Sequence, residues 1–217
     1  MADESGSQRR SSNETIPRPR IQTLSDLIFG LALSIGAITL LSERPSSITA
    51  LAISLVGFGW AFLILAIVWV RYTRIMSVLP VETGRMVGAN MLLLFLVSIE
   101  PYLYNLIPAS YVSLPGQLNS EITTALYAID MGSIFLIIAY FTHELTVEEK
   151  RLIPRELLRS YRLQRNSTIL TAALFLLSIS PVFWSSTFLG VPLRMILWMS
   201  TFLVAFVRRE VERHRTS

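Results

Sequence analysis

The sequence predicts an all-α, polytopic membrane protein with six transmembrane helices and both termini in the cytoplasm. Of its 217 residues, 52% are hydrophobic and only 16% are charged, whereas a soluble domain of this size carries about 25% charged residues. The apolar residues are gathered into runs of about 20, the length that crosses a hydrocarbon core ~30 Å thick. Composition and run length together indicate helices that span a bilayer.

Six apolar runs define the predicted spans of one transmembrane domain, residues 20–207. The runs cover about 21–41, 48–70, 86–107, 120–141, 166–184 and 189–207. Within the third run, Pro101 is expected to kink or end the helix, because proline lacks the backbone donor and clashes with the preceding turn.

Three polar segments flank or interrupt these spans. Residues 1–19 are rich in Ser, Arg, Asn, Pro and Glu, and such a composition predicts a disordered tail in the cytoplasm. Residues 143–165 hold the densest charge and predict a helical cytoplasmic hairpin that is broken near Pro154. Residues 208–217 are expected to form a basic cytoplasmic tail.

The distribution of basic residues predicts the orientation. All of the 19 lysines and arginines except Arg44 and Arg194 fall on one side of the predicted membrane. Basic residues near the ends of spans stay in the cytoplasm, which places both termini there. Contact of these residues with anionic lipid headgroups also explains the net charge of +4 without a nucleic-acid partner.

Several classes of chemistry are disfavoured. The chain has no cysteine, which excludes disulfides and thiolate metal sites. His143 and His214 lie in polar segments, so we expect no histidine-based site within the membrane. The sequence lacks the motifs of zinc proteases, P-loop enzymes and serine hydrolases. We therefore expect no enzyme, no metal and no cofactor.

Three carboxylates lie in or near the spans, where an ionisable group is expensive and often functional. Glu100, next to Pro101, is interpreted as a carboxylate at the outer interface. Asp130 lies nearer the middle of the membrane and is either an interhelical hydrogen-bond partner or part of an ion or proton path. Asp26 lies close to the start of the first span.

The first span has a regular line of large aliphatic residues. With 100° between successive residues, Leu31, Ile35 and Ile38 fall within about 60° of one another. Ser25 and Asp26 point about 120° and 140° away from Leu31 on the same helix. On pattern alone, the aliphatic line also fits a face that simply meets lipid or the core.

Four segments of the sequence resemble one family. Residues 20–26, Arg20-Ile-Gln-Thr-Leu-Ser-Asp26, are similar to the Arg-x-x-x-Phe-Ser-Asp signature of the transmembrane protein 175 family of potassium channels. Trp69 with the basic and aromatic residues after it resembles the end of the family's second span. Residues 90–101 resemble the third span and residues 125–130 the start of the fourth.

The resemblance implies a homotetramer of six-span subunits in the cell membrane of a prokaryote, surrounded by lipid. The first span of each subunit would line a central pore, and the family's hydrophobic constriction maps onto Leu31, Ile35 and Ile38. Ser34 and Thr39 would offer polar contacts beside the pore. Potassium and other monovalent cations would be the permeant partners.

The resemblance also implies a structural network, which comprises Arg20, Leu24, Ser25, Asp26, Trp69 and Asn90. We expect Ser25 and Asp26 to brace the pore helix against neighbouring spans, with Asn90 as a partner. Two positions depart from the family pattern. Leu24 stands where the signature has Phe, and the histidine that commonly follows Trp69 is absent, with Tyr72 and Thr73 nearby.

The predicted function is passive, potassium-selective conduction, in which the constriction selects and gates by dehydration of the ion. One alternative is a proton-coupled or secondary transporter that uses Asp26 and Asp130. Another is a non-conducting membrane scaffold that acts through residues 143–165.

Overall fold

The computed structural model describes residues 20–42, 47–79, 84–110, 120–148, 152–188 and 191–213. The helices are α1 (Arg20–Ser42), α2 (Ile48–Met76), α3 (Gly84–Ser110), α4 (Ser120–Thr146), α5 (Arg155–Leu177), α6 (Val182–Ser185) and α7 (Leu193–Arg213). The strands β1 (Thr187–Phe188) and β2 (Val191–Pro192) form a small antiparallel hairpin. The helical class is confirmed for this part of the chain, whereas the hairpin between α6 and α7 was not predicted.

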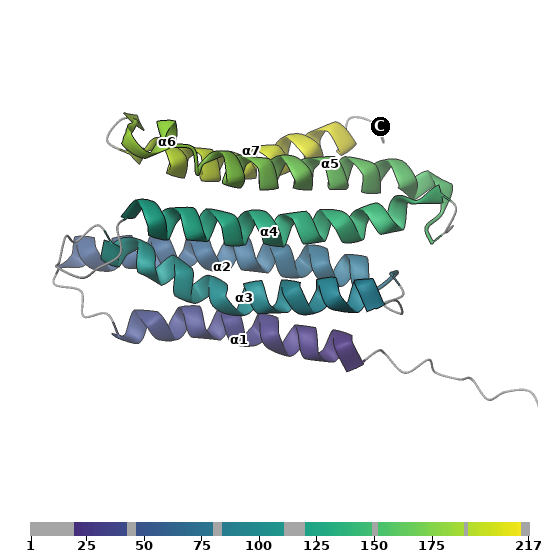
Figure 1. Cartoon of the computed structure of the whole chain (residues 1–217), viewed down its shortest axis with the longest axis horizontal. Helices are drawn as coiled ribbons and strands as arrows, with labels where there is room; N and C mark the ends of the chain where they lie inside the picture. The colour runs from purple at the N-terminus through teal and green to yellow at the C-terminus, as the bar shows by residue number, and fades with distance from the viewer. Residues whose placement is uncertain are drawn as a thin grey trace, which may run out of the picture.

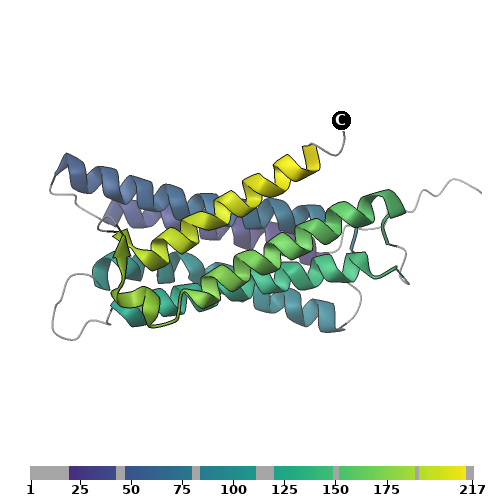
Figure 2. The same cartoon turned by 90° about the horizontal axis from the view of Figure 1, so that it is seen from above.

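The long helices lie side by side in one bundle (Figure 1). Helix α1 packs against α2 and α3, α4 packs between α3 and α5, and α7 packs against α5. In Figure 2, α5 and α7 slope in the same direction and both lie at an angle to α2. Helix α1 therefore lies at the edge of the bundle, with one side on α2 and α3.

By length and composition, three helices in the described part are able to cross a membrane: Ile48–Met76, Gly84–Ile107 and Ser120–Thr146. The predicted first and sixth spans contain shorter apolar helices, Thr23–Ile38 and Leu193–Val204. The predicted fifth span falls in α5, whose first turns are charged. Six membrane crossings, with both ends in the cytoplasm, therefore remain a prediction.

Proline positions shape α3 and the connection between α4 and α5. Helix α3 does not end at Pro101 but continues to Ser110, and Figure 1 shows it changing direction along its length, as a proline within a helix causes. Helix α4 runs to Thr146, and α5 begins directly after Pro154. The helical structure is thus interrupted before Arg155, near Pro154 as predicted, but both arms of the hairpin are continuous with α4 and α5.

Helices α5 and α7 do not end where the last two spans were predicted to end. Helix α5 ends at Leu177 rather than near 184, because the chain turns before Pro181 and starts the short helix α6. Helix α7 continues to Arg213, into the segment that we interpreted as a basic tail. The predicted tail of residues 1–19 and residues 214–217 lie outside the described residues.

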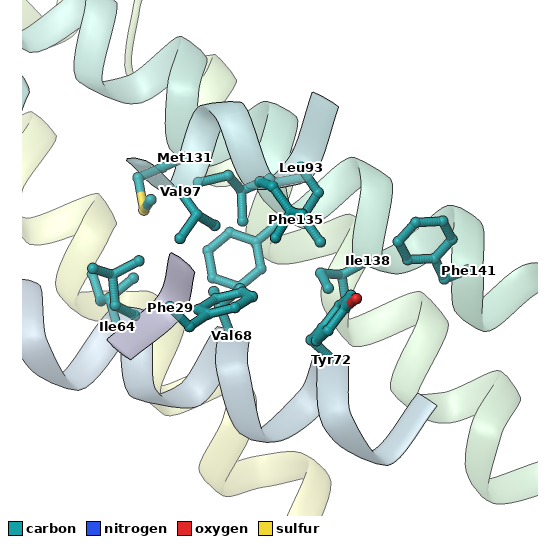
Figure 3. Packing of buried hydrophobic residues seen from close by; sticks show 14 of the residues in the cluster. Phe29, Ile64, Val68, Tyr72, Leu93, Val97, Met131, Phe135, Ile138 and Phe141 are labelled. Atoms are coloured by element: carbon teal, nitrogen blue, oxygen red, sulfur yellow. The ribbon is translucent and has the colours of Figure 1, made fainter. Parts of the chain in front are cut away.

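The apolar core joins α1 to the rest of the bundle. Phe29 of α1 lies against Val68 and Tyr72 of α2 (Figure 3), and the rings of Phe29 and Tyr72 have their centroids 5.4 Å apart. Leu93 and Val97 of α3 belong to the same buried cluster. Because protein interiors are close-packed, these contacts fix which face of α1 is turned towards the bundle.

Candidate functional site

The two faces of α1 differ sharply in exposure. Ser25, Phe29 and Ala32 face the bundle and are 0%, 0% and 1% exposed. On the opposite side, Leu31, Ile35 and Ile38 are 60%, 37% and 60% exposed. The aliphatic line found by helical spacing is therefore not part of the subunit core.

The exposed line continues towards the start of α1. Leu24 is 43% exposed and Leu27 is 67% exposed, and both lie on the same side as Leu31 by helical spacing. A continuous row of large apolar side chains on one helix needs an apolar surface to cover it. In a membrane protein this surface is lipid, another subunit, or a narrow pore with matching rows.

A buried polar cluster ties α1 to α2 and α3. Tyr72 Oη lies 2.6 Å from Ser25 Oγ and 2.8 Å from Asn90 Oδ1. Asn90 Nδ2 lies 3.5 Å from Ser25 Oγ. All three side chains are fully buried, where a polar group without a hydrogen-bond partner is costly.

The cluster can satisfy all of its contacts as a closed ring. Tyr72 has one hydroxyl proton and Asn90 Oδ1 only accepts, so the ring closes when Tyr72 donates to Asn90. Ser25 then donates to Tyr72 Oη, and the Asn90 amide donates to Ser25 Oγ. A buried hydrogen-bonded network favours one arrangement of its helices, here that of α1, α2 and α3.

A second polar contact lies nearer the surface. Trp69 Nε1 donates to Asp26 Oδ1 at 3.2 Å, and this bond joins α1 to α2. Asp26 is exposed and Trp69 is partly exposed. Because the acceptor is a carboxylate, the bond is stronger than one between neutral groups, although access to solvent reduces its contribution.

The remaining predicted site residues either make other contacts or have side chains outside the described part of the structure. Ser34 lies beside the exposed line, where its hydroxyl donates to Gly30 O at 2.8 Å. This bond uses the only donor of the serine and leaves its oxygen as an acceptor. The side chains of Arg20 and Thr39 lie outside the described residues.

The surroundings of Glu100 and Asp130 differ from those expected from the sequence. We interpreted Glu100 as interfacial, but its side chain is completely buried, on the face of α3 that meets α4, where its Oε1 accepts a bond from Tyr127 at 3.4 Å. Asp130 is 3% exposed, and neither of its oxygens has a hydrogen-bond partner in the described part of the chain. Of the two interpretations of Asp130, the interhelical hydrogen bond is therefore not found there.

Two residues that sequence reasoning did not assign to the site hold α1 in place. Tyr72 occupies the centre of the polar cluster, although its position after Trp69 and next to Arg71 looks like an ordinary interfacial aromatic residue. Phe29 sits on the buried face of α1, and its spacing of four residues from Ser25 was the available signal. Within the described residues, no group of three or more His, Asp or Glu side chains is placed to hold a metal ion.

Comparison with known proteins supports a relationship over the first half of the bundle. Residues 20–101 match the family model described as the endosomal/lysosomal potassium channel TMEM175. This range contains the exposed line of α1, the buried polar cluster and the Asp26–Trp69 pair. A search of curated protein sequences finds no match.

Two solved structures share the fold over most of the chain. One is a lysosomal potassium-selective channel TMEM175 homolog from Chamaesiphon minutus, with a TM-score of 0.59 and 17% identity, over 88% of this chain and 97% of that chain. The other is a variant of the potassium channel MtTMEM175, with a TM-score of 0.59 and 16% identity, over 90% of this chain and 93% of that chain. The resemblance to the TMEM175 family that the sequence motifs predict is therefore confirmed, by the family match over residues 20–101 and by a shared fold over most of the chain.

Proposed function

We propose that this protein is a potassium-selective channel, in which four copies of the chain place their α1 helices around a central pore. The observation that carries the proposal is the exposed aliphatic line of α1, Leu31, Ile35 and Ile38, on a helix whose other face is anchored. The family match over residues 20–101 and the fold shared with two potassium channels support it.

The constriction would work by dehydration. Four copies of Leu31, Ile35 and Ile38 form three stacked apolar rings, which offer no replacement for the water around an ion. Potassium holds its water less tightly than sodium does, so a narrow apolar passage favours potassium. The same rings close the pore by dewetting when they narrow.

Polar groups near the rings have supporting roles. Ser34 and Thr39 lie beside the line by helical spacing, and the Ser34 oxygen keeps a free acceptor position for a cation or its water. Ser25, Asp26, Trp69 and Asn90 hold α1 against α2 and α3. In this proposal the acid of the signature motif positions the pore helix and does not meet the ions.

The proposed setting is the cell membrane, with six spans and both termini in the cytoplasm. The channel needs no cofactor, and its partners are three further copies of the chain, membrane lipid and monovalent cations. Arg71 at the end of α2 lies 5.8 Å from the centre of the Phe135 ring and donates to Thr168 at 3.3 Å. These contacts link the cytoplasmic end of α2 to α4 and α5.

The direct test is single-channel recording of the purified chain in planar bilayers under a potassium/sodium gradient. We expect discrete current steps that reverse near the potassium equilibrium potential. Saturable flux without current steps, lost on Asp130→Asn, would instead establish the proton-coupled or secondary transporter. Absence of any current or flux would leave a scaffold function of residues 143–165.

A further inference from the structure

A cavity of about 620 Å³ lies between α1, α2, α3 and α7. It opens on the side of α1 away from the exposed line, and none of Leu31, Ile35 and Ile38 lines it. The largest share of its wall comes from α2 between Ile53 and Leu65. Its volume lies within the ~300–1,000 Å³ typical of sites for small organic molecules.

The cavity wall is rich in aromatic side chains. Phe58, Trp60 and Phe62 come from α2, and Trp198 and Phe202 come from α7. The Trp60 and Phe202 rings meet edge to face with their centroids 5.0 Å apart. Aromatic faces attract cations as well as apolar groups, so these walls suit a ligand that has a cationic group and an apolar body.

One acidic side chain lines the same cavity. Glu100 is fully excluded from solvent, and its Oε2 has no hydrogen-bond partner among the described residues. Its other oxygen accepts from the Tyr127 hydroxyl. A buried carboxylate without enough donors is costly, and a positively charged donor forms a stronger hydrogen bond with it than a neutral donor does.

We propose that this cavity binds a hydrophobic amine, with the apolar body against the aromatic walls and the ammonium group on Glu100. A ligand of this kind partitions into the bilayer and reaches the cavity from the lipid. A neutral acyl chain fits the apolar walls equally well but leaves Glu100 Oε2 without a donor. The proposal concerns binding alone and does not depend on whether the protein conducts ions.

The glycines of the bundle provide a matched pair of test variants. Gly59 lines the cavity, and a Cβ atom added there meets nothing within 4 Å. Gly59→Leu therefore fills cavity space without a backbone clash. A Cβ atom added at Gly88 on α3 also meets nothing within 4 Å, but Gly88 does not line the cavity. Gly88→Leu is therefore the control for replacing a helical glycine by leucine.

The experiment uses the full chain in lipid nanodiscs and two photoreactive probes. One probe is decylamine with a diazirine in its chain, and the other is its N-acetyl derivative, which has the same tail and no charge. After illumination, labelled peptides are mapped by mass spectrometry, and apparent affinities are measured by competition with unlabelled decylamine. Size-exclusion profiles and thermal unfolding confirm that each variant folds.

We expect the amine to label peptides from α2 and α7 that line the cavity, with about tenfold higher apparent affinity than the acetylated probe. Glu100→Gln removes this difference, Gly59→Leu abolishes labelling by both probes, and Gly88→Leu changes neither.

Equal labelling by the two probes in the unmodified protein overturns the proposal in favour of a lipid-tail cavity. Labelling confined to sites outside the cavity overturns it as well, and indicates that another copy of the chain covers this face. Because the two probes are compared in the unmodified protein, the test holds even if Glu100→Gln fails to fold.

Discussion

The two faces of α1 differ in their contacts and in their exposure. The face towards the bundle combines the buried polar ring of Ser25, Tyr72 and Asn90 with the ring contact between Phe29 and Tyr72. The opposite face has a line of large aliphatic side chains, of which Leu27, Leu31 and Ile38 are the most exposed. One face thus holds α1 in the bundle, and the other is the face that we propose meets the ions, so substitutions on each face should have separate consequences.

The largest effect on stability is expected for Phe29→Ala. The substitution leaves a cavity between α1 and α2, and truncation of a buried Phe destabilises proteins by about 3–5 kcal/mol. The fraction of folded protein after heating, followed by fluorescence-detected size exclusion, measures the change. Stability equal to that of the unmodified protein would mean that α1 is not anchored through this face.

Tyr72→Phe should have a smaller effect. The substitution keeps the ring beside Phe29 and removes the hydroxyl from the polar ring, so Ser25 and Asn90 each lose a partner inside the bundle. We expect a loss of about 1–2 kcal/mol. The neighbouring Thr73→Val is the control, because the Thr73 hydroxyl donates only within α2, to Trp69 O and Val70 O. A Tyr72→Phe variant as stable as this control would contradict a stabilising role of the Tyr72 hydroxyl in the buried network.

Asp26→Ala should reduce stability by about 0.5–1 kcal/mol, because its bond to Trp69 is exposed to solvent. We expect a lower yield of assembled tetramer and an unchanged ratio of potassium to sodium permeability in the channels that do form. Size exclusion measures the first and bilayer recording the second. A stable tetramer with altered selectivity alone would contradict the bracing role and place Asp26 on the ion path.

Leu31→Ala should have the smallest effect on stability, below about 0.5 kcal/mol, because the side chain does not pack within the subunit and exposed positions tolerate change. The same variant should lower the preference for potassium over sodium by widening one apolar ring. Thermal unfolding and reversal potentials test the two parts separately. A large loss of folded protein would instead show that Leu31 is buried between subunits.

Local patterns in the sequence predicted much of this arrangement. Hydropathy located the apolar segments, and the 100° spacing of a helix was enough to separate Leu31, Ile35 and Ile38 from Ser25. Contacts between distant segments were harder to predict. Nothing in the sequence near Tyr72 shows that it meets both Ser25 and Asn90, since these residues come together only when three helices pack.

The acids illustrate the same limit. Glu100 precedes a proline in the second half of the third predicted span, and we interpreted it as interfacial for this reason. Helix α3 continues through Pro101, however, and the Glu100 side chain is buried. The β-hairpin between α6 and α7 lacked a signal as well, because two-residue strands are too short to show alternation. Burial and pairing of this kind depend on the packing of whole helices.

The central claim is that the exposed line of α1 faces the permeating ions, and Ile35→Asn tests it most directly. Ile169→Asn on α5 is the matched control, since Ile169 is 45% exposed but lies on a helix outside the proposed pore. The measurement is the reversal potential of single channels with potassium on one side of the bilayer and sodium on the other. We predict that Ile35→Asn wets the constriction and moves the reversal potential towards zero, while Ile169→Asn leaves it unchanged. An unchanged reversal potential in Ile35→Asn channels would contradict the assignment of this line to the pore.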